Sequence, residues 1–351
     1  MTCCASARGS PAPYAAAYGS APAGASSDDE LISSAVCISG IPWRVSVVLR
    51  DGTTQAEFLP ELGLLGTSLT VAEREFVALP GGVDAYRAGH QTGVPLLAPW
   101  ANRIAQRQYR AAGVDIDLTG VDLHTDAQGL PIHGMMTAAT GWQIVARDEA
   151  LLRARFDYGA RPDLLHAFPF PHGLEVEFAL VAGDGDGSSG DDGRLTVTTT
   201  LRATGDRAVP VAFGWHPYLR LPVGRRASWR LVLPDRDHLE LDARGIPTGA
   251  SEQERAEAEP IGERTFDDLY ALGDDRELAV EGDDCRLVVR YEDGYPFAQV
   301  FAPPKAEFVC LEPMTAATNA LATDACPIVA PGSEFTARFS IVVTCEPPPS
   351  M

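Results

Sequence analysis

Short stretches in which apolar and polar residues alternate recur along most of the chain. They are residues 43–49, 152–158, 174–181, 194–201, 228–233, 285–291 and 335–343. Alternation with a period of two is typical of strands buried on one face, because successive side chains point to opposite faces of a sheet. One face of the expected strand at 194–201 would carry Leu195, Val197, Thr199 and Leu201.

Helical signals are weak by comparison. Residues 251–259 could form one or two exposed helical turns, but they have no apolar stripe with which a helix could pack. Turn-forming residues fill the gaps between the expected strands, with 33 Gly and 27 Pro in the whole chain. Many strands separated by turns, without alternating helices, predict an all-β sandwich or barrel. Because no repeat or linker divides the body, we expect one large domain over residues 31–347.

Two segments do not follow this pattern. Residues 1–30 are rich in Ala, Ser, Gly and Pro and lack a continuous apolar run, so we expect a disordered leader rather than a secretory signal. The loop at 183–193 begins like a calcium loop, with Asp184 and Asp186. However, Leu195 stands where such a loop needs a glutamate. A flexible connection between two strands of a hairpin fits this loop better.

Composition limits the partners and the compartment. The formal net charge of −20 argues against nucleic acid and anionic membranes as partners, and no stretch approaches the length of a membrane span. The cysteines are odd in number, scattered and without a C-x-x-C pair: Cys3, Cys4, Cys37, Cys285, Cys310, Cys326 and Cys345. This pattern argues against a disulfide scaffold or a thiolate zinc site. We therefore expect reduced thiols in a cytoplasmic protein. The sequence does not indicate the oligomeric state.

Two short stretches place polar groups in turn-rich surroundings. In PLLAPWANRIAQRQY, Arg103 follows an apolar run and could present fixed donors to hydroxyl groups at a cleft. It could equally be a surface arginine whose stem covers Trp100. In GLPIHGMM, His133 precedes Gly134, so the backbone can turn sharply there. A loop histidine with local hydrogen bonds would look the same.

Two further stretches carry a histidine and a glutamate at the ends of apolar runs. In AFGWHPYLRL, His216 lies between Trp215 and Tyr218, whose rings would partly desolvate the imidazole and move its pKa from the ordinary value of about 6.5. Such rings suit the apolar face of a sugar, and they suit a packed core equally well. Glu312 ends the apolar run 308–311, where a carboxylate is unusual unless it has a partner such as an arginine.

Together, these stretches resemble the motifs of the aldose 1-epimerase (galactose mutarotase) family. The matching positions are Asn102-Arg103-Ile104, His133-Gly134, His216-Pro217-Tyr218, Glu312-Pro313 and Asn319-Ala320. Residues 168–180 and 330–335 also resemble family segments, and the order agrees from roughly residue 34 to residue 343. Each motif is weak alone, but the ordered set is fairly specific.

The resemblance implies a galactose mutarotase-like supersandwich, which is a large antiparallel β-sandwich with an open sugar-binding cleft. It implies an isomerase that interconverts the α and β anomers of a free aldose such as glucose or galactose, without a cofactor or metal. Glu312 would be the general base and His216 the general acid. The expected substrate contacts are Asn102, Arg103, His133, Trp215, Tyr218 and an aspartate, for which Asp267 fits the spacing to Tyr270 better than Asp268 does.

Two alternatives remain open at this point. An epimerase of a hexose 6-phosphate would need extra cations, which Arg103, Arg107 and Arg110 could supply. Against this, methionines follow the histidine-glycine pair, where an arginine would favour a phosphorylated sugar. A non-catalytic carbohydrate-binding protein of the same fold would need no acid–base pair, so the presence of both Glu312 and His216 counts against it.

Overall fold

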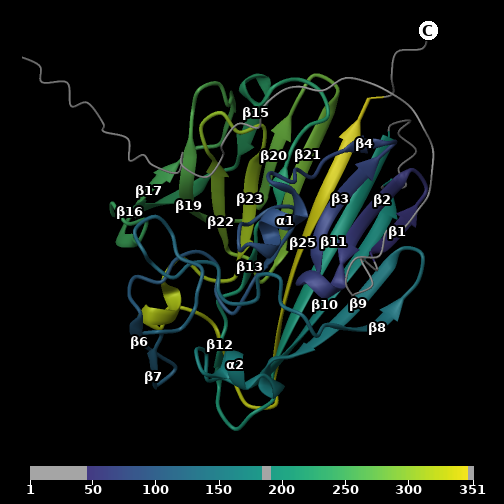
Figure 1. Ribbon diagram of the computed structural model, residues 1–351. Coiled ribbons are helices and arrows are strands. Elements are labelled where there is room, and N and C mark those ends of the chain that lie inside the picture. The colour runs from purple at the N-terminus through teal and green to yellow at the C-terminus, as the bar shows by residue number, and fades with distance from the viewer. Residues whose placement is uncertain (1–45, 184–190, 347–351) are drawn as a thin grey trace, which may run out of the picture.

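The computed structural model describes residues 46–183 and 191–346, and antiparallel strands dominate them (Figure 1). The larger sheet has nine strands in the order β18 (Glu257–Pro260), β15 (Arg230–Leu233), β20 (Glu277–Glu281), β21 (Cys285–Asp293), β25 (Glu334–Cys345), β11 (Asp191–Ala203), β10 (His172–Ala182), β9 (Leu151–Asp157) and β8 (Gln143–Arg147).

The second sheet has eight strands. Their order is β17 (Pro247–Glu254), β16 (Arg236–Leu241), β19 (Phe266–Leu272), β22 (Phe297–Ala302), β23 (Val309–Met314), β13 (Gly214–Trp215) and β5 (Leu96–Leu97), with β14 (Tyr218–Leu219) paired to β23. All the strand pairs in both sheets are antiparallel. The predicted all-β sandwich is therefore confirmed.

Smaller elements complete the described part of the chain. A four-stranded sheet of β1 (Val47–Asp51), β2 (Thr54–Leu59), β3 (Leu65–Val71) and β4 (Arg74–Glu75) contacts β10 and β11. The remaining strands pair as β6 (Gln108–Ala111) with β7 (Val114–Asp117) and β12 (Val209–Pro210) with β24 (Ile328–Val329).

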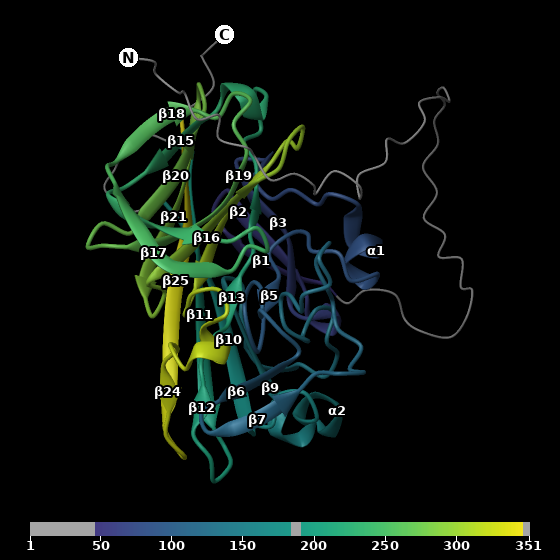
Figure 2. The same cartoon turned by 90° about the vertical axis from the view of Figure 1, so that its left-hand side faces the viewer.

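The helices are short: α1 (Gly82–Arg87), α2 (Pro162–Leu165), and the 3₁₀ turns η1 (Pro60–Leu62), η2 (Tyr158–Ala160), η3 (Arg226–Ser228) and η4 (Ala320–Thr323). Figure 2 shows α1 and β25 on opposite sides of the molecule. No helix in residues 46–183 or 191–346 is long and apolar enough to cross a membrane.

The core lies between the facing surfaces of the two large sheets. In β11 the side chains at positions 195, 197, 199 and 201 are buried, as the alternating pattern predicts. Trp215 of the eight-stranded sheet meets the nine-stranded sheet through Phe178, with ring centroids 5.7 Å apart, and through Phe339, at 6.1 Å. These aromatic contacts join the two layers, since fully buried aromatic rings contribute most to core energetics.

Residues 251–259 do not form the one or two exposed helical turns that the sequence left possible. This stretch forms the end of β17, the turn that follows it and the first part of β18. Strand β17 is an edge strand with mostly exposed side chains on both faces, so it does not need the apolar alternation by which the other strands are recognised. Pairing with β16 holds it extended and overrides the local helical preference of its glutamates.

The expectation that all the cysteines are reduced is wrong for Cys285 and Cys345, which form a disulfide. These residues are directly opposite each other in β21 and β25, with Cα atoms 4.2 Å apart, although 60 residues separate them in the chain. Strand pairing therefore creates a contact that their sequence spacing does not reveal. Cys310 and Cys326 are buried and free.

Several expectations fall on residues outside the described ranges. They concern the leader at 1–30, the domain limits at 31 and 347, three of the cysteines and most of the loop at 183–193. The two strands that flank this loop pair as an antiparallel hairpin, from His172↔Ala203 to Ala182↔Gly193. The first expected strand, at 43–49, is described only from residue 46, and β1 begins at Val47. The cytoplasmic location stays a prediction.

We predict that Phe178→Ala lowers the free energy of unfolding by about 3–5 kcal/mol, because it leaves a cavity where Phe178 meets Phe58 and Trp215. Urea unfolding measures this change. The exposed Val223 provides a control, and Val223→Ala should change the same free energy by no more than about 0.5 kcal/mol. Equal losses in the two variants would contradict the core described here.

Candidate active site

One pocket opens on the face of the eight-stranded sheet that is turned away from the main core. Strand pairing places Gln299 of β22 opposite Glu312 of β23, so their side chains share one face. Their neighbours Val300 and Leu311 belong to the main core on the other face. Residues that are adjacent in sequence thus point to opposite faces of the sheet, so that one lines the polar pocket and the next packs in the apolar core.

The pocket has a volume of about 340 Å³. Its lining includes all the predicted site residues except Trp215, namely Asn102, Arg103, His133, His216, Tyr218, Asp267 and Glu312. These residues come from strands, turns and loops that are far apart in the chain, and the fold brings them to one place. Residues that the sequence analysis did not identify complete the lining, and they include Gln91, His124, Asp126, Gln299 and Phe301.

The proposed acid–base pair is in direct contact. His216 Nε2 lies 3.3 Å from Glu312 Oε1, and only 5% and 2% of the two side chains are exposed. Burial lowers the pKa of His216 to about 3 and raises the pKa of Glu312 well above its ordinary value, with Asp267 adding to the second effect. Both shifts favour the uncharged forms, because desolvation penalises charge. Transfer of a proton from the carboxyl group to the imidazole across this contact would make Glu312 a base and His216 an acid.

The strand end at β13 sets the position of the His216 ring. The backbone N–H of His216 donates to the carbonyl of Pro95, and the ring stacks on Tyr218 with centroids 4.6 Å apart and planes 9° from parallel. Trp215 points the other way, into the core, where its Nε1 donates to Thr199 Oγ1 at 3.1 Å. The aromatic neighbours of His216 therefore have different roles, since Tyr218 lines the pocket and Trp215 anchors the strand.

The turn that carries His133 requires a glycine at the next position, residue 134. A Cβ atom on Gly134 would lie 2.1 Å from the carbonyl oxygen of Ala98, so a larger residue does not fit. His133 itself has a positive φ of 63°, and its backbone N–H donates to the carbonyl of Asn102. Its ring meets the ring of His216 edge-on, with centroids 5.3 Å apart. Burial and the nearby His216 hold the pKa of His133 well below its ordinary value.

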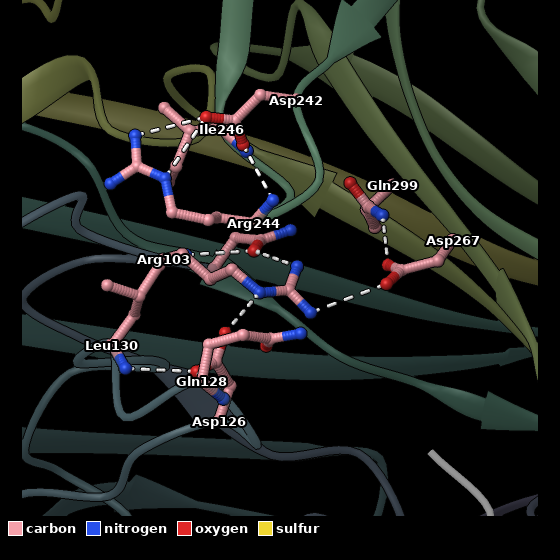
Figure 3. Close-up of polar contacts among 10 residues, drawn as sticks. Arg103, Asp126, Gln128, Leu130, Asp242, Arg244, Ile246, Asp267 and Gln299 are labelled. Atoms are coloured by element: carbon pink, nitrogen blue, oxygen red, sulfur yellow. Dashed lines mark hydrogen bonds and ion pairs between the residues drawn. The ribbon is translucent and has the colours of Figure 1, made fainter. Parts of the chain in front are cut away.

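Arg103 is a buried residue of the pocket rather than a surface arginine over Trp100 (Figure 3). Its Nε donates to Asp126 Oδ2 at 2.8 Å, and its Nη2 donates to Asp267 Oδ2 at 3.3 Å. Asp267 also accepts from Gln299 Nε2, at 2.7 Å. A guanidinium held between two carboxylates has a fixed orientation, because its planar donors match both partners.

The two candidate aspartates lie on opposite faces of β19. Asp267 lines the pocket mouth with 46% of its side chain exposed, and surrounding protein raises its pKa against the opposing effect of Arg103. Asp268 lies 3.3 Å from His238 Nε2, away from the pocket. The geometry therefore brings Asp267, and not Asp268, to the other site residues.

Several buried polar atoms of the pocket have no hydrogen-bond partner. Within the described residues they are Gln91 Oε1, His133 Nδ1, His216 Nδ1, Gln299 Oε1 and Glu312 Oε2. An unpaired buried polar atom is destabilising, and a bound ligand can supply the missing partner. A sugar, which carries many hydroxyl groups, has the donors and acceptors that this wall lacks.

Gln299 had a recognisable signal, because it is a lone amide within the apolar stretch of β22. Asp126 had no such signal in the sequence, since aspartate is ordinary in a turn.

In residues 46–183 and 191–346, no group of three or more His, Cys, Asp or Glu side chains is arranged to hold a metal ion.

The sequence model described as aldose 1-epimerase matches residues 46–342. Among curated proteins, none matches the chain significantly.

Among solved structures, the chain is similar to a protein of Synechocystis sp. PCC 6803, with 21% identity, a TM-score of 0.68 and coverage of 89% of this chain and 100% of that one. It is also similar to the GalM/aldose epimerase homologue of C. elegans, with 15% identity, a TM-score of 0.70 and coverage of 86% and 99%. A third is the galactose 1-epimerase of Lactobacillus acidophilus NCFM, with 12% identity, a TM-score of 0.67 and coverage of 86% and 95%. At these identities the likeness shows the fold alone, and it confirms the galactose mutarotase-like architecture.

The charge of His238, whose partner Asp268 adjoins Asp267 of the candidate site, can be tested through the pH dependence of stability. Hydrogen bonds with Asp268 and then Glu254 raise the pKa of this half-buried histidine to about 9, against the opposing effect of burial. A folded-state pKa above the unfolded value of about 6.5 stabilises the protein fully below that value, and the stabilisation is lost as pH rises through about 9. We predict that His238→Gln lowers stability at pH 6 and that this loss shrinks towards pH 10.

Urea unfolding at several pH values measures the difference between wild type and His238→Gln. The exposed His166 provides the matched control, and His166→Gln should change stability little at any pH. A loss in His238→Gln that stays constant from pH 6 to pH 10 would contradict the charged state assigned to His238.

Proposed function

Because the chain belongs to the aldose 1-epimerase family, we propose that it interconverts the α and β anomers of a free aldose through acid–base catalysed opening and closure of the sugar ring. The observation that carries the proposal is the buried contact between His216 Nε2 and Glu312 Oε1 within the pocket. An imidazole and a carboxyl group held together are the groups that this reaction requires.

Mutarotation moves two protons at two oxygens of one carbon. The anomeric hydroxyl must lose a proton while the ring oxygen gains one, since otherwise the ring oxygen would leave as an unstable alkoxide. Each positioned group that transfers a proton typically accelerates such a reaction by about 10²–10⁴-fold. Glu312 is the proposed base at the anomeric hydroxyl, and His216 is the proposed acid at the ring oxygen.

A proton that can move between Glu312 and His216 suits this reaction cycle. Ring opening begins once a proton has passed from the Glu312 carboxyl to His216 across their contact. Glu312 then takes the anomeric proton and His216 gives one to the ring oxygen, which leaves both groups uncharged with the open-chain aldehyde bound. Burial favours these uncharged forms. After rotation about the bond between C1 and C2, the two groups exchange roles, and the ring closes on the other face of the aldehyde. The pair therefore needs no net gain or loss of protons over a turnover.

The other lining residues would bind the sugar. Arg103 and His133 are the proposed contacts of the ring oxygen and hydroxyl groups, and Asn102 adjoins them. Asp267 and Gln299 supply acceptors at the pocket mouth and wall. Tyr218 extends the apolar surface beside His216, which suits the C–H face of a pyranose.

The charges of the pocket favour a free sugar over a phosphorylated one. Arg107 donates to the backbone carbonyls of Leu118 and Val121, and Arg110 pairs with Asp115 at the surface, so neither lines the pocket. Arg103 already has two carboxylate partners. A phosphate dianion would meet carboxylates without an additional cation, which is unfavourable. The similarity to a galactose 1-epimerase suggests galactose as the first sugar to test.

We predict that Glu312→Gln and His216→Asn each slow anomer exchange by about 10²–10⁴-fold, because each removes one proton-transfer group. Polarimetry with freshly dissolved α-galactose measures the rate, and circular dichroism checks that the fold is intact. Exposed residues of the same types provide matched controls, so Glu277→Gln and His166→Asn should exchange anomers as fast as wild type. Near-normal rates in both site variants would refute the assigned pair. Sugar binding without catalysis in wild type would instead favour a binding protein.

We also predict that kcat/KM for glucose exceeds that for glucose 6-phosphate by about a hundredfold, because like charges facing each other destabilise a complex by several kcal/mol. Polarimetry on both sugars under the same conditions gives the ratio. A preference for glucose 6-phosphate would assign the protein to the phosphorylated substrate, and equal values would refute the charge argument.

A further inference from the structure

We propose that Asp126 is a positioning residue, which sets the direction in which Arg103 presents its guanidinium group to the sugar. The inference rests on the proposed function, and it concerns a residue that contacts Arg103 rather than the reacting atoms. Asp126 carries no sequence signal, and its role follows from its contacts alone.

The contact between Asp126 and Arg103 is buried and well directed. The Asp126 side chain is 0% exposed and the Arg103 side chain 8%, and Nε of the arginine donates to Oδ2 of the aspartate at 2.8 Å (Figure 3). Because Nε is the inner nitrogen of the guanidinium, this bond fixes the plane of the group. The outer nitrogens then reach Asn102 Oδ1 at 3.1 Å and Asp267 Oδ2 at 3.3 Å.

The Asp126 carboxylate is itself held rigidly. Its second oxygen, Oδ1, accepts from the backbone N–H groups of Gln128 and Leu130, each at 2.9 Å. The carboxylate therefore cannot rotate without breaking the turn. This turn leads into the segment that carries His133, which pairs with the Arg103 segment through a bridge between Arg103 and Ile132. Asp126 thus joins two segments that both carry site residues.

A third element confines the guanidinium from another side. Gly245, in the turn between β16 and β17, has a positive φ of 73°, and a Cβ atom there would lie 2.9 Å from Arg103 Nη1. Arg103 is therefore enclosed by the turn at Gly245, by Asp126 and by Asp267. Little freedom remains for its side chain, so the direction of its donors depends on these contacts.

The charges around Arg103 explain why the direction of its guanidinium group depends on Asp126. Arg103 lies between two carboxylates, and removing one leaves a buried positive charge that is less compensated. The guanidinium would then be drawn towards Asp267, and it would compete with the sugar for oxygens of that carboxylate. Loss of Asp126 should therefore weaken substrate binding more than it slows the proton transfers.

The test is a double-variant cycle with Asp126→Asn, Arg103→Ala and the combined variant. Asparagine keeps an oxygen that can accept from Gln128 and Leu130, so the turn is retained while the charged partner of Arg103 is lost. We expect Asp126→Asn to lower kcat/KM about tenfold, mainly by raising KM, because hydrogen bonds to charged groups have about this effect. In the Arg103→Ala background, Asp126→Asn should cause almost no further loss, because residues that act through one contact are not additive.

Asp235 provides a matched control, because it too joins an arginine to a backbone N–H group. Its Oδ2 accepts from Arg255 Nη1 at 2.9 Å, and its Oδ1 accepts from the backbone N–H of Ala256. Both side chains are exposed, and neither residue lines the pocket. Asp235→Asn should therefore leave KM and kcat at their wild-type values.

Each outcome decides the proposal. Additive losses in the double-variant cycle would overturn it, because Asp126 would then act independently of Arg103. If Asp126→Asn does not fold, Asp126→Ser is the second variant, since a serine hydroxyl also accepts from nearby backbone N–H groups. Failure of both to fold would make Asp126 a structural residue and overturn the proposal too. An inactive wild type would refute the proposed function and this inference together, whereas an active wild type with additive losses would refute the inference alone.

Discussion

The burial of Glu312 beside His216 is the constraint on which the rest of the site depends. A carboxyl group within an apolar strand must be protonated or paired, because an isolated buried charge is strongly destabilising. The contact at 3.3 Å provides the partner, and burial favours the uncharged form of both groups. The arrangement requires residue 312 to point away from the core while residue 311 points into it. The pleat of β23 imposes this alternation, so the packed core and the pocket share the same strands.

The surrounding charges extend this arrangement outward. Arg103 lies between Asp126 and Asp267, which holds its planar donors in one direction and limits the net charge of the pocket. Asp267 in turn accepts from Gln299, whose own carbonyl oxygen has no partner. Within this network, Asp126 is buried and bonded to Arg103, whereas Gln299 presents an oxygen without a partner at the pocket wall. Hydroxyl groups of a bound ligand could donate to these acceptors.

The strands could be predicted because their signal is local, whereas several features of the site depend on contacts between distant segments. The buried face of residues 194–201 follows from alternation alone. Gln299 was missed, although it is a lone amide within an apolar stretch. Trp215 was expected at the sugar, but the pleat turns it into the core while His216 faces the pocket. The disulfide between Cys285 and Cys345 and the role inferred for Asp126 depend on which strands and loops become neighbours. The extended conformation of residues 251–259 gives no local signal, since an edge strand exposed on both faces has no apolar period.

By itself, the amino-acid sequence determined the strand-rich class of the fold, the ordered motifs and the residue types available for proton transfer. These features are encoded in neighbouring residues, whose alternation and turn preferences act over a few positions. Only the tertiary structure decided that His216 and Glu312 touch, that Asp267 rather than Asp268 faces the pocket, and that Arg103 is buried. Such contacts depend on strand order and register, and these arise from the packing of the whole sandwich rather than from any local stretch of chain.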